Sequence, residues 1–516
     1  MLVFPTPNLY WLCWIAVAPL LLAVLRTRRG EVAVPETLAR APLIPARAGQ
    51  AFLLGWFSGV IYYAGSNYWV MYSMHVYGGL TTPLALGVLL LFCLYLGLQT
   101  GLFALLVALA ARNAPGSFAG VRRALIAAPF LWVAVEFCRT QVIGFPWDLL
   151  GTAQVDNIPL TRLASVTGVY GLSLEIMLVN TAFAAAFLAR RRARTLLFGA
   201  AVLAAAALQL SIFVEPPPVP AQGNARLVQQ NLALDLDWKF DFYRQTLGEL
   251  TASSGNPPAA ESTGEPRPDL IVWPESPAPF LATDPLLHEM LSHMATENQA
   301  HVIAGATGTN QPKPGVVEAQ MIYNSAVLVA PDGRWAGRYD KVHLVPFGEY
   351  VPFKSLFTFA QKLTREVGDF VPGSQHTVFD LGRYKVGTFI CYESVFPGEV
   401  RHFANNGAQV FVNISNDGWF GPTAAPFQHL NQARMRAIEN QRWILRATNT
   451  GITAVIDPFG RVVEQAPRGV RTTLDAPFGV VTQTTFYTRH GDWFPWLCVI
   501  ISIAAVRAGF RRVRRA

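Results

Sequence analysis

Long apolar stretches separated by short polar segments dominate the first part of the chain. Six of them lie near residues 9–25, 51–74, 82–111, 124–143, 165–189 and 195–213, and a seventh lies near 494–509. As a helix, each is long enough to cross most or all of the roughly 30 Å hydrocarbon layer of a bilayer. The pattern predicts an α-helical membrane bundle with seven spans.

Between the sixth and seventh stretches, short apolar runs alternate with amphipathic segments. The runs predict strands near 225–232, 269–273, 301–306, 325–330, 384–390 and 409–414, and helical periodicity covers 284–297 and 427–442. A proline-rich connector, 216–220, precedes them. We therefore expect a bundle over 1–213, a layered α/β domain over 214–493, and a last span with a basic tail over 494–516.

Arginine is distributed unevenly around the predicted spans. One side carries Arg26, Arg28, Arg29, Arg40, Arg47, Arg112, Arg122, Arg123, Arg190, Arg191, Arg192, Arg194 and the cluster 511–515. The opposite loops, 75–81 and 139–163, contain only Arg139 and Arg162. Because short cytoplasmic loops are enriched in arginine and lysine, the arginine-rich side is predicted to be cytoplasmic and the α/β domain extracytoplasmic.

The composition agrees with a membrane protein, since 52% of the 516 residues are hydrophobic and only 14% are charged. The chain has a net charge of +8, but residues 1–213 contain 14 arginines against six acids, and 494–516 contain five arginines and no acid. The α/β domain is therefore acidic. Its charge gives no reason to expect a nucleic acid as a partner.

Cysteine usage singles out one residue. Four of the five cysteines, Cys13, Cys93, Cys138 and Cys498, lie in or beside apolar stretches, and only Cys391 lies in the α/β domain. A lone thiol in an oxidising compartment has no disulfide partner, so it is either buried and inert or kept for chemistry. No His-Glu-x-x-His, paired-cysteine or phosphate-binding motif is present, and no metal or cofactor is expected.

Three polar residues lie in or just after apolar or aromatic runs. They are Glu275, Lys341 and Cys391. In α/β sheets the carboxyl ends of strands form the ligand crevice. A carboxylate can take the thiol proton, the thiolate can attack a carbonyl carbon, and an ammonium can stabilise the oxyanion. The three residues predict acyl transfer through a thioester.

Further residues are weaker candidates with ordinary alternatives. Glu349 follows Lys341 in one short segment and could hold its ammonium, and Glu393 follows Cys391, but either could be an ordinary surface acid. Trp238, Tyr392 and Trp419 could line a substrate path, although aromatic residues in an α/β domain are more often core. We expect supporting roles for the two acids and leave both alternatives open for the aromatics.

In the membrane part, Glu136 and Arg139 lie three residues apart on one predicted helical face. Charged residues within a span either pair with each other or serve a pathway, so an ion pair and substrate gating are the two interpretations. We favour the ion pair.

The blocks 271–276, 338–344 and 387–393, together with 347–352 and 416–420, resemble the nitrilase superfamily. Fused to a membrane bundle, they resemble the apolipoprotein N-acyltransferase family. Further blocks at 144–147, 434–437 and 450–453 extend the resemblance over nearly the whole chain. Each block alone is weak, but their order is specific.

The resemblance implies an αββα sandwich and a catalytic trio of Glu275, Lys341 and Cys391. It also implies a phospholipid acyl donor and, as acceptor, the α-amino group of a diacylglyceryl-modified lipoprotein cysteine. We expect a multi-pass monomer in the bacterial inner membrane, with its catalytic domain in the periplasm. The family pattern has eight spans, which leaves room for one span upstream of residue 1.

Two other functions remain open from the sequence. The same three residues could serve a membrane-tethered amidase of the nitrilase type, which would release ammonia or a free acid without any lipid. Alternatively, the chain could be a transporter or receptor with an incidental cysteine, and Cys391→Ala would then leave it fully functional.

Overall fold

The computed structural model describes residues 1–26, 45–112, 118–189, 191–234, 236, 238–255, 267–276, 278–310, 321–351 and 370–511. The chain forms two compact units. The helical unit contains Met1–Met71, Thr82–Glu215 and His490–Ala516. The α/β unit contains Pro216–Arg489 and also the short segment Tyr72–Thr81, which lies along the chain between two parts of the helical unit.

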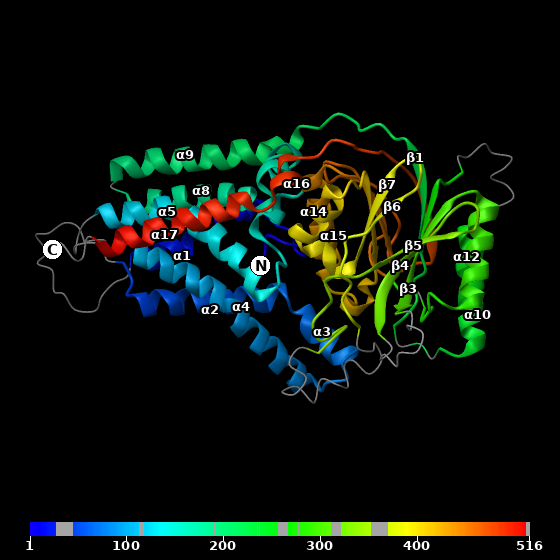
Figure 1. The fold of residues 1–516 in the computed structure, drawn as a ribbon. Coiled ribbons are helices and arrows are strands. Elements are labelled where there is room, and N and C mark those ends of the chain that lie inside the picture. Colours follow the sequence, from blue (N-terminus) through cyan, green and yellow to red (C-terminus); the bar gives the residue numbers. More distant parts are fainter. Residues whose placement is uncertain are drawn as a thin grey trace, which may run out of the picture. The chain divides into compact units, whose positions relative to one another are not determined.

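The helical unit is built mainly from long apolar helices (Figure 1). Its longer helices are α1 (Ala18–Leu25), α2 (Ala48–Ser66), α3 (Trp69–Val76), α4 (Thr82–Ala110), α5 (Phe118–Cys138), α8 (Val169–Leu188), α9 (Arg191–Leu210) and α17 (Trp493–Arg511). Among the described residues, four stretches are long and apolar enough to span a bilayer: Thr82–Ala110, Val169–Leu188, Ala193–Phe213 and Trp493–Phe510. The predicted helical membrane bundle is confirmed.

The other three predicted spans are helical but shorter or interrupted. Stretch 9–25 forms a 3-10 turn, Tyr10–Trp14, followed by α1. Stretch 51–74 is divided between α2 and α3, and α5 ends in a π-helical turn, Arg139–Ile143. Seven spans therefore remain a prediction.

Helices α2 and α4 pack through glycines. Gly55 and Gly59 lie one turn apart on α2, and Gly97 and Gly101 do so on α4. A Cβ atom on Gly59 would lie only 3.0 Å from the Cα of Gly97, and one on Gly55 only 2.4 Å from a carbonyl oxygen of α4. Small residues spaced in this way let two membrane helices bring their backbones into contact.

Glu136 and Arg139 are both buried but take separate partners. Arg139 Nη1 donates to the hydroxyl of Tyr63 at 2.9 Å, and Glu136 Oε1 accepts from the backbone N–H of Leu150 at 2.7 Å. Both residues lie near the end of α5, but their charged groups reach different segments, α2 and the backbone at Leu150, rather than each other. The favoured ion pair is therefore replaced by two other contacts.

The α/β unit contains two six-stranded sheets. The first has the order β12 (Thr472–Phe478), β1 (Gly223–Gln229), β2 (Leu270–Val272), β3 (His301–Thr309), β4 (Ile322–Val329) and β5 (Trp335–Asp340). The second has the order β11 (Val462–Gln465), β10 (Ala454–Ile456), β9 (Ile444–Thr448), β8 (Val410–Ser415), β7 (Lys385–Ile390) and β6 (Val378–Asp380). Strands β1, β2 and β3 of the first sheet are parallel to one another, as are β7, β8 and β9 of the second. The other neighbouring strands in both sheets are antiparallel.

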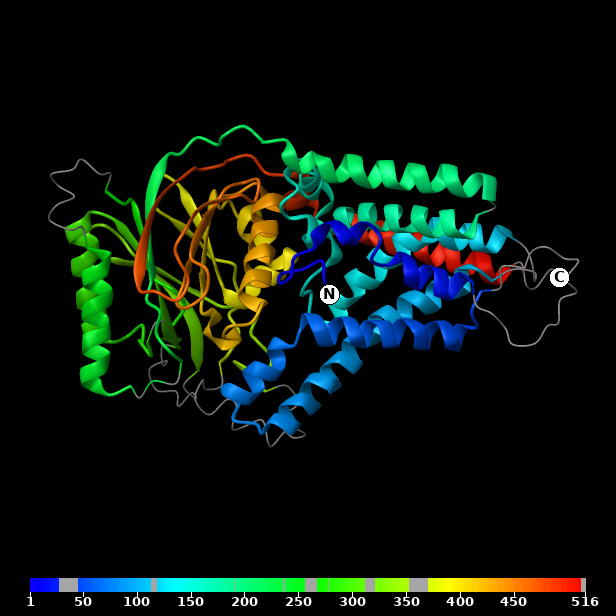
Figure 2. The same cartoon turned by 180° about the vertical axis from the view of Figure 1, so that it is seen from behind.

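The two sheets pack face to face with helices on both outer sides (Figure 2). Side chains such as Val272 of β2 and Val412 of β8 belong to one buried cluster between the sheets. Helices α10 (Phe240–Ser254) and α12 (Pro285–Asn298) cover the first sheet, and α14 (Pro397–Asn405) and α15 (Ala425–Asn440) cover the second. This is the αββα sandwich that the sequence resemblance predicted.

Candidate active site

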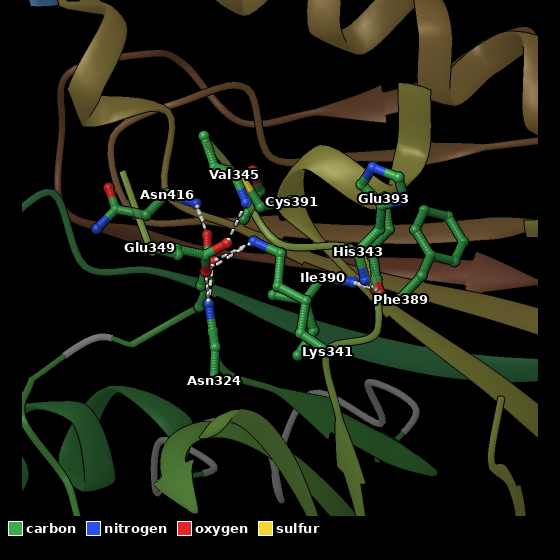
Figure 3. A network of polar contacts seen from close by, with 12 residues as sticks. Asn324, Lys341, His343, Val345, Glu349, Phe389, Ile390, Cys391, Glu393 and Asn416 are labelled. Atoms are coloured by element: carbon green, nitrogen blue, oxygen red, sulfur yellow. Dashed lines mark hydrogen bonds and ion pairs between the residues drawn. The ribbon is translucent and has the colours of Figure 1, made fainter. Parts of the chain in front are cut away.

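The three predicted catalytic residues follow strands of both sheets, and Figure 3 shows two of them, Lys341 and Cys391. Glu275 comes three residues after β2, and Lys341 comes directly after β5. Cys391 comes directly after β7 and begins the 3-10 helix η6 (Cys391–Val395). All three side chains are buried. The structure thus brings a thiol, an ammonium and a carboxylate together in one site inside the sandwich.

The ammonium of Lys341 lies between two carboxylates. Its Nζ atom is 3.0 Å from Oε1 of Glu349 and 3.5 Å from Oε1 of Glu275. Burial disfavours the charge on Lys341, but Glu349 and Glu275 outweigh it and raise the pKa of the ammonium above its usual range. Lys341 is therefore a permanent positive charge beside the thiol.

An asparagine that the sequence reasoning missed joins the two carboxylates. Asn324 Nδ2, on β4, donates to Oε1 of Glu275 and to Oε1 of Glu349, each at 2.7 Å. The second oxygens accept from backbone N–H groups, that of Asn416 to Glu275 at 2.8 Å and that of Val345 to Glu349 at 2.7 Å. Both acids are thus held in fixed orientations by groups that can only donate.

Cys391 lies in a strained turn. Its φ angle is +48°, in the left-handed region that a residue with a Cβ adopts at a cost of about 1–3 kcal/mol. Burial, followed by the charge of Glu275, raises the pKa of the thiol well above its usual range, although Lys341 acts in the opposite direction. The resting nucleophile is therefore a neutral thiol that needs a base when it reacts.

Glu393 ties this turn to the segment that follows Lys341. Its Oε1 accepts from the hydroxyl of Tyr339 at 2.7 Å and from the backbone N–H groups of Val342 at 2.7 Å and His343 at 3.1 Å. Its Oε2 accepts from the backbone N–H of Ile390 at 2.7 Å. One buried carboxylate thus fixes the two loops relative to each other.

The three aromatic candidates lie in different surroundings. Trp238 packs against Phe242, with 5.1 Å between ring centroids, at the edge of the cluster under α10 and α12. Tyr392 is buried in the turn beside the thiol. Trp419 packs against Tyr77 of the segment Tyr72–Thr81, with 5.4 Å between centroids. Only Tyr392 is adjacent to the nucleophile along the chain.

Two family profiles match the chain. The carbon–nitrogen hydrolase profile matches residues 205–482, and that of the apolipoprotein N-acyltransferase N-terminal domain matches residues 1–182. The apolipoprotein N-acyltransferase of Geobacter metallireducens is 35% identical over 99% of this chain and 93% of its own. That of Bradyrhizobium diazoefficiens is 33% identical over 76% of this chain and 74% of its own.

The chain belongs to the apolipoprotein N-acyltransferase family.

As a member of the apolipoprotein N-acyltransferase family, the protein is a membrane acyltransferase with a nitrilase-type catalytic fold. Among solved structures, an amidase from Nesterenkonia sp. matches at 20% identity with a TM-score of 0.37, over 52% of this chain and 93% of that one. The chain combines a carbon–nitrogen hydrolase domain with the long apolar helices of a membrane protein.

Proposed function

We propose that this enzyme transfers an acyl chain from a membrane phospholipid, through a thioester on Cys391, to a lipoprotein. The acceptor is the α-amino group of the N-terminal diacylglyceryl cysteine. The observation that supports these roles is the convergence of a buried thiol, a permanent ammonium and two oriented carboxylates. The relatives that match over most of the chain are named for the same reaction.

In the first half-reaction Glu275 accepts the thiol proton as Cys391 Sγ attacks the ester carbonyl of the phospholipid. Lys341, with nearby backbone N–H groups, stabilises the tetrahedral oxyanion. The carbon–oxygen ester bond then breaks, and the leaving lysophospholipid oxygen takes the proton from Glu275. A thioester remains on Cys391, while Glu349 and Glu393 keep Lys341 and the turn in position.

In the second half-reaction the acceptor reacts as a free amine, whose usual pKa is about 7.7–8.0. The amine nitrogen attacks the thioester and Glu275 receives its proton. The carbon–sulfur bond then breaks, and the leaving sulfur of Cys391 takes this proton from Glu275, which restores the thiol and the carboxylate. Donor and acceptor react one after the other, so ping-pong kinetics are expected. No step needs a metal ion or an organic cofactor.

We further propose that the α/β unit lies in the periplasm and that the helical unit crosses the inner membrane seven times. The distribution of arginine around the apolar stretches supports this orientation. Both substrates carry acyl chains, so a catalytic unit anchored at the membrane surface meets them by diffusion in two dimensions. Within this proposal the enzyme acts as a monomer.

The first test detects the acyl-enzyme directly. Purified full-length protein is incubated with a phospholipid that carries a labelled acyl chain, without acceptor, and its intact mass is measured. A hydroxylamine-labile adduct should form on wild-type protein but not on Cys391→Ala, and it should move to a diacylated lipopeptide. Without an adduct from any phospholipid the proposal fails, and release of ammonia from a small amide would then support the amidase alternative.

A further inference from the structure

A second buried cluster adjoins Cys391 and is separate from the Glu275, Lys341 and Glu349 network. It consists of Ser394 of η6, Asp417 at the start of η7 (Asp417–Phe420), His429 of α15 and Arg446 of β9. All four side chains are buried, with relative exposures of 1% or less. We call these four residues the His429 cluster.

The imidazole of His429 is held from both sides. Its Nδ1 atom lies 2.8 Å from Oδ1 of Asp417, whose other oxygen lies 2.8 Å from Nη2 of Arg446. Its Nε2 atom lies 3.0 Å from the backbone carbonyl oxygen of Cys391 and 2.8 Å from the hydroxyl of Ser394. The ring therefore connects an ion pair in the core to the backbone of the nucleophile.

The partners indicate which atoms donate. Burial disfavours charge on Asp417, but Arg446 and His429 outweigh it and hold the pKa of this carboxyl well below its usual range. Asp417 is therefore a carboxylate, and Nδ1 of the ring faces both this carboxylate and Nη2 of Arg446. The carbonyl oxygen of Cys391 can only accept, so Nε2 of His429 is the donor in the hydrogen bond between them.

Two other readings of the cluster are possible from its residue types. Ligand atoms of Cys391, Asp417 and His429 lie within 4.8 Å of one another, as in a metal site or a cysteine-histidine-aspartate triad. However, the guanidinium of Arg446 lies 2.8 Å from Asp417 and 3.1 Å from Nδ1 of His429, so a fixed positive charge already occupies the place of a cation. A triad would require the ring to exchange the thiol proton, which the experiment below tests.

We propose that His429 is a positioning residue, which donates from Nε2 to the carbonyl oxygen of Cys391 and so holds the left-handed turn that presents the thiol. Asp417 and Arg446 fix the ring in the orientation that this hydrogen bond needs. The inference rests on the proposed role of Cys391 as the nucleophile. A residue with a Cβ favours negative φ, so the turn relaxes when the hydrogen bond is lost, and a displacement of about 1 Å at a reacting atom lowers the rate about a hundredfold.

The test compares two variants at position 429 whose amide side chains differ only in length. In His429→Gln the side-chain NH₂ can occupy the place of Nε2 and still donate to Cys391, whereas in His429→Asn it occupies the place of Nδ1 and reaches only Asp417. Full-length variants are given labelled phospholipid, and the single-turnover rate of thioester formation is measured per folded molecule. His293→Asn, a change at an exposed histidine of α12, is the matched control.

We expect His429→Gln to stay within about tenfold of wild type and His429→Asn to fall about a hundredfold, with an unchanged phospholipid concentration at half-maximal rate. Equal rates in the two variants, or a faster His429→Asn, would overturn the proposal. Complete loss in both with intact folding would overturn it too, in favour of proton transfer by the ring.

A further variant keeps the test decisive if His429→Asn does not fold. Ser394→Ala leaves the imidazole and its bond to Cys391 in place, so its rate should change less than threefold, and a loss of a hundredfold would contradict the proposal. Cys391→Ala separates this inference from the proposed function. If wild-type protein is acylated at another residue, the role of Cys391 fails whatever His429 does.

Discussion

At the scale of single residues, the site depends on how one ammonium is shared between two acids. Lys341, Glu275 and Glu349 are all buried, and a buried charge is tolerated only when it is paired and hydrogen-bonded. Asn324 supplies the remaining donors to both acids. The arrangement keeps Lys341 charged for the oxyanion, while the low polarity and the charge of Glu275 keep the thiol of Cys391 protonated.

The raised pKa of Cys391 predicts how the resting thiol reacts with alkylating agents. Below its pKa a thiol has a thiolate fraction that rises tenfold per pH unit, so a raised pKa extends this rise to higher pH. With the other four cysteines replaced by serine, the rate of iodoacetamide modification should climb without a plateau up to pH 10. The measurement is intact mass against time at each pH.

A short peptide with one cysteine and both ends blocked serves as the reference, because its thiol, with a pKa near 8.5, levels off above about pH 9.5. A plateau for Cys391 below pH 8 would show a preformed thiolate and contradict the description of a neutral resting nucleophile.

At the scale of elements, the strands position the residues of the site, and the helices of the helical unit pack against one another. Each proposed catalytic residue comes just after the carboxyl end of a strand, so the hydrogen-bond register of the sheets sets the distances in the site. In the helical unit, helices approach as closely as their smallest residues allow. Gly55, Gly59, Gly97 and Gly101 make the contact between α2 and α4 possible.

Replacing one of these glycines should separate the two helices. In Gly59→Leu the new side chain meets Gly97 and Thr100 of α4 at 3.0 Å or less, an overpacking that costs about 1–3 kcal/mol. We expect a lower melting temperature in detergent and a lower yield of folded protein. The matched control is Gly87→Leu on α4, where a Cβ meets nothing within 4 Å. Equal melting temperatures for the two variants would show that the close contact does not matter.

At the scale of the whole molecule, the α/β unit is not made from one continuous piece of chain. The segment Tyr72–Thr81 belongs to it, and Ser73 Oγ donates to the backbone oxygen of Trp419 at 2.7 Å. Gly421 lies so close to Tyr72 that a Cβ there would be 2.1 Å from the ring. The segment Tyr72–Thr81, which contains the second half of α3 and the turn before α4, therefore contacts the loop that follows β8.

The proposed orientation can be tested with two single cysteines. In a chain whose five native cysteines are replaced by alanine, Lys385→Cys lies on the exposed start of β7 and Arg122→Cys on an exposed position of α5. A membrane-impermeant maleimide should label Lys385→Cys in cells with a permeabilised outer membrane. It should label Arg122→Cys only after the inner membrane is broken. Labelling in the opposite order would reverse the proposed topology.

The sequence by itself determined the membrane class, the layered α/β domain and the three residues proposed for catalysis. Apolar length and strand-like runs are local properties, and a lone Cys391 beside an apolar run is conspicuous without any structure. The six predicted strands are all present. Strands β6 and β10 were missed because three residues carry too little pattern, and β11 because it is largely exposed.

Only the tertiary structure decided which other polar residues meet the site. Asn324 lies 49 residues after Glu275, and His429 lies 38 residues after Cys391. Nothing in their local sequence distinguishes them from ordinary polar residues. Trp238 packs against Phe242 beside α10, and its place on the substrate path stays a prediction. Such contacts depend on the register of the strands in two sheets and on the packing between the sheets. They join segments that are far apart in the chain, so no periodic pattern in the sequence indicates them.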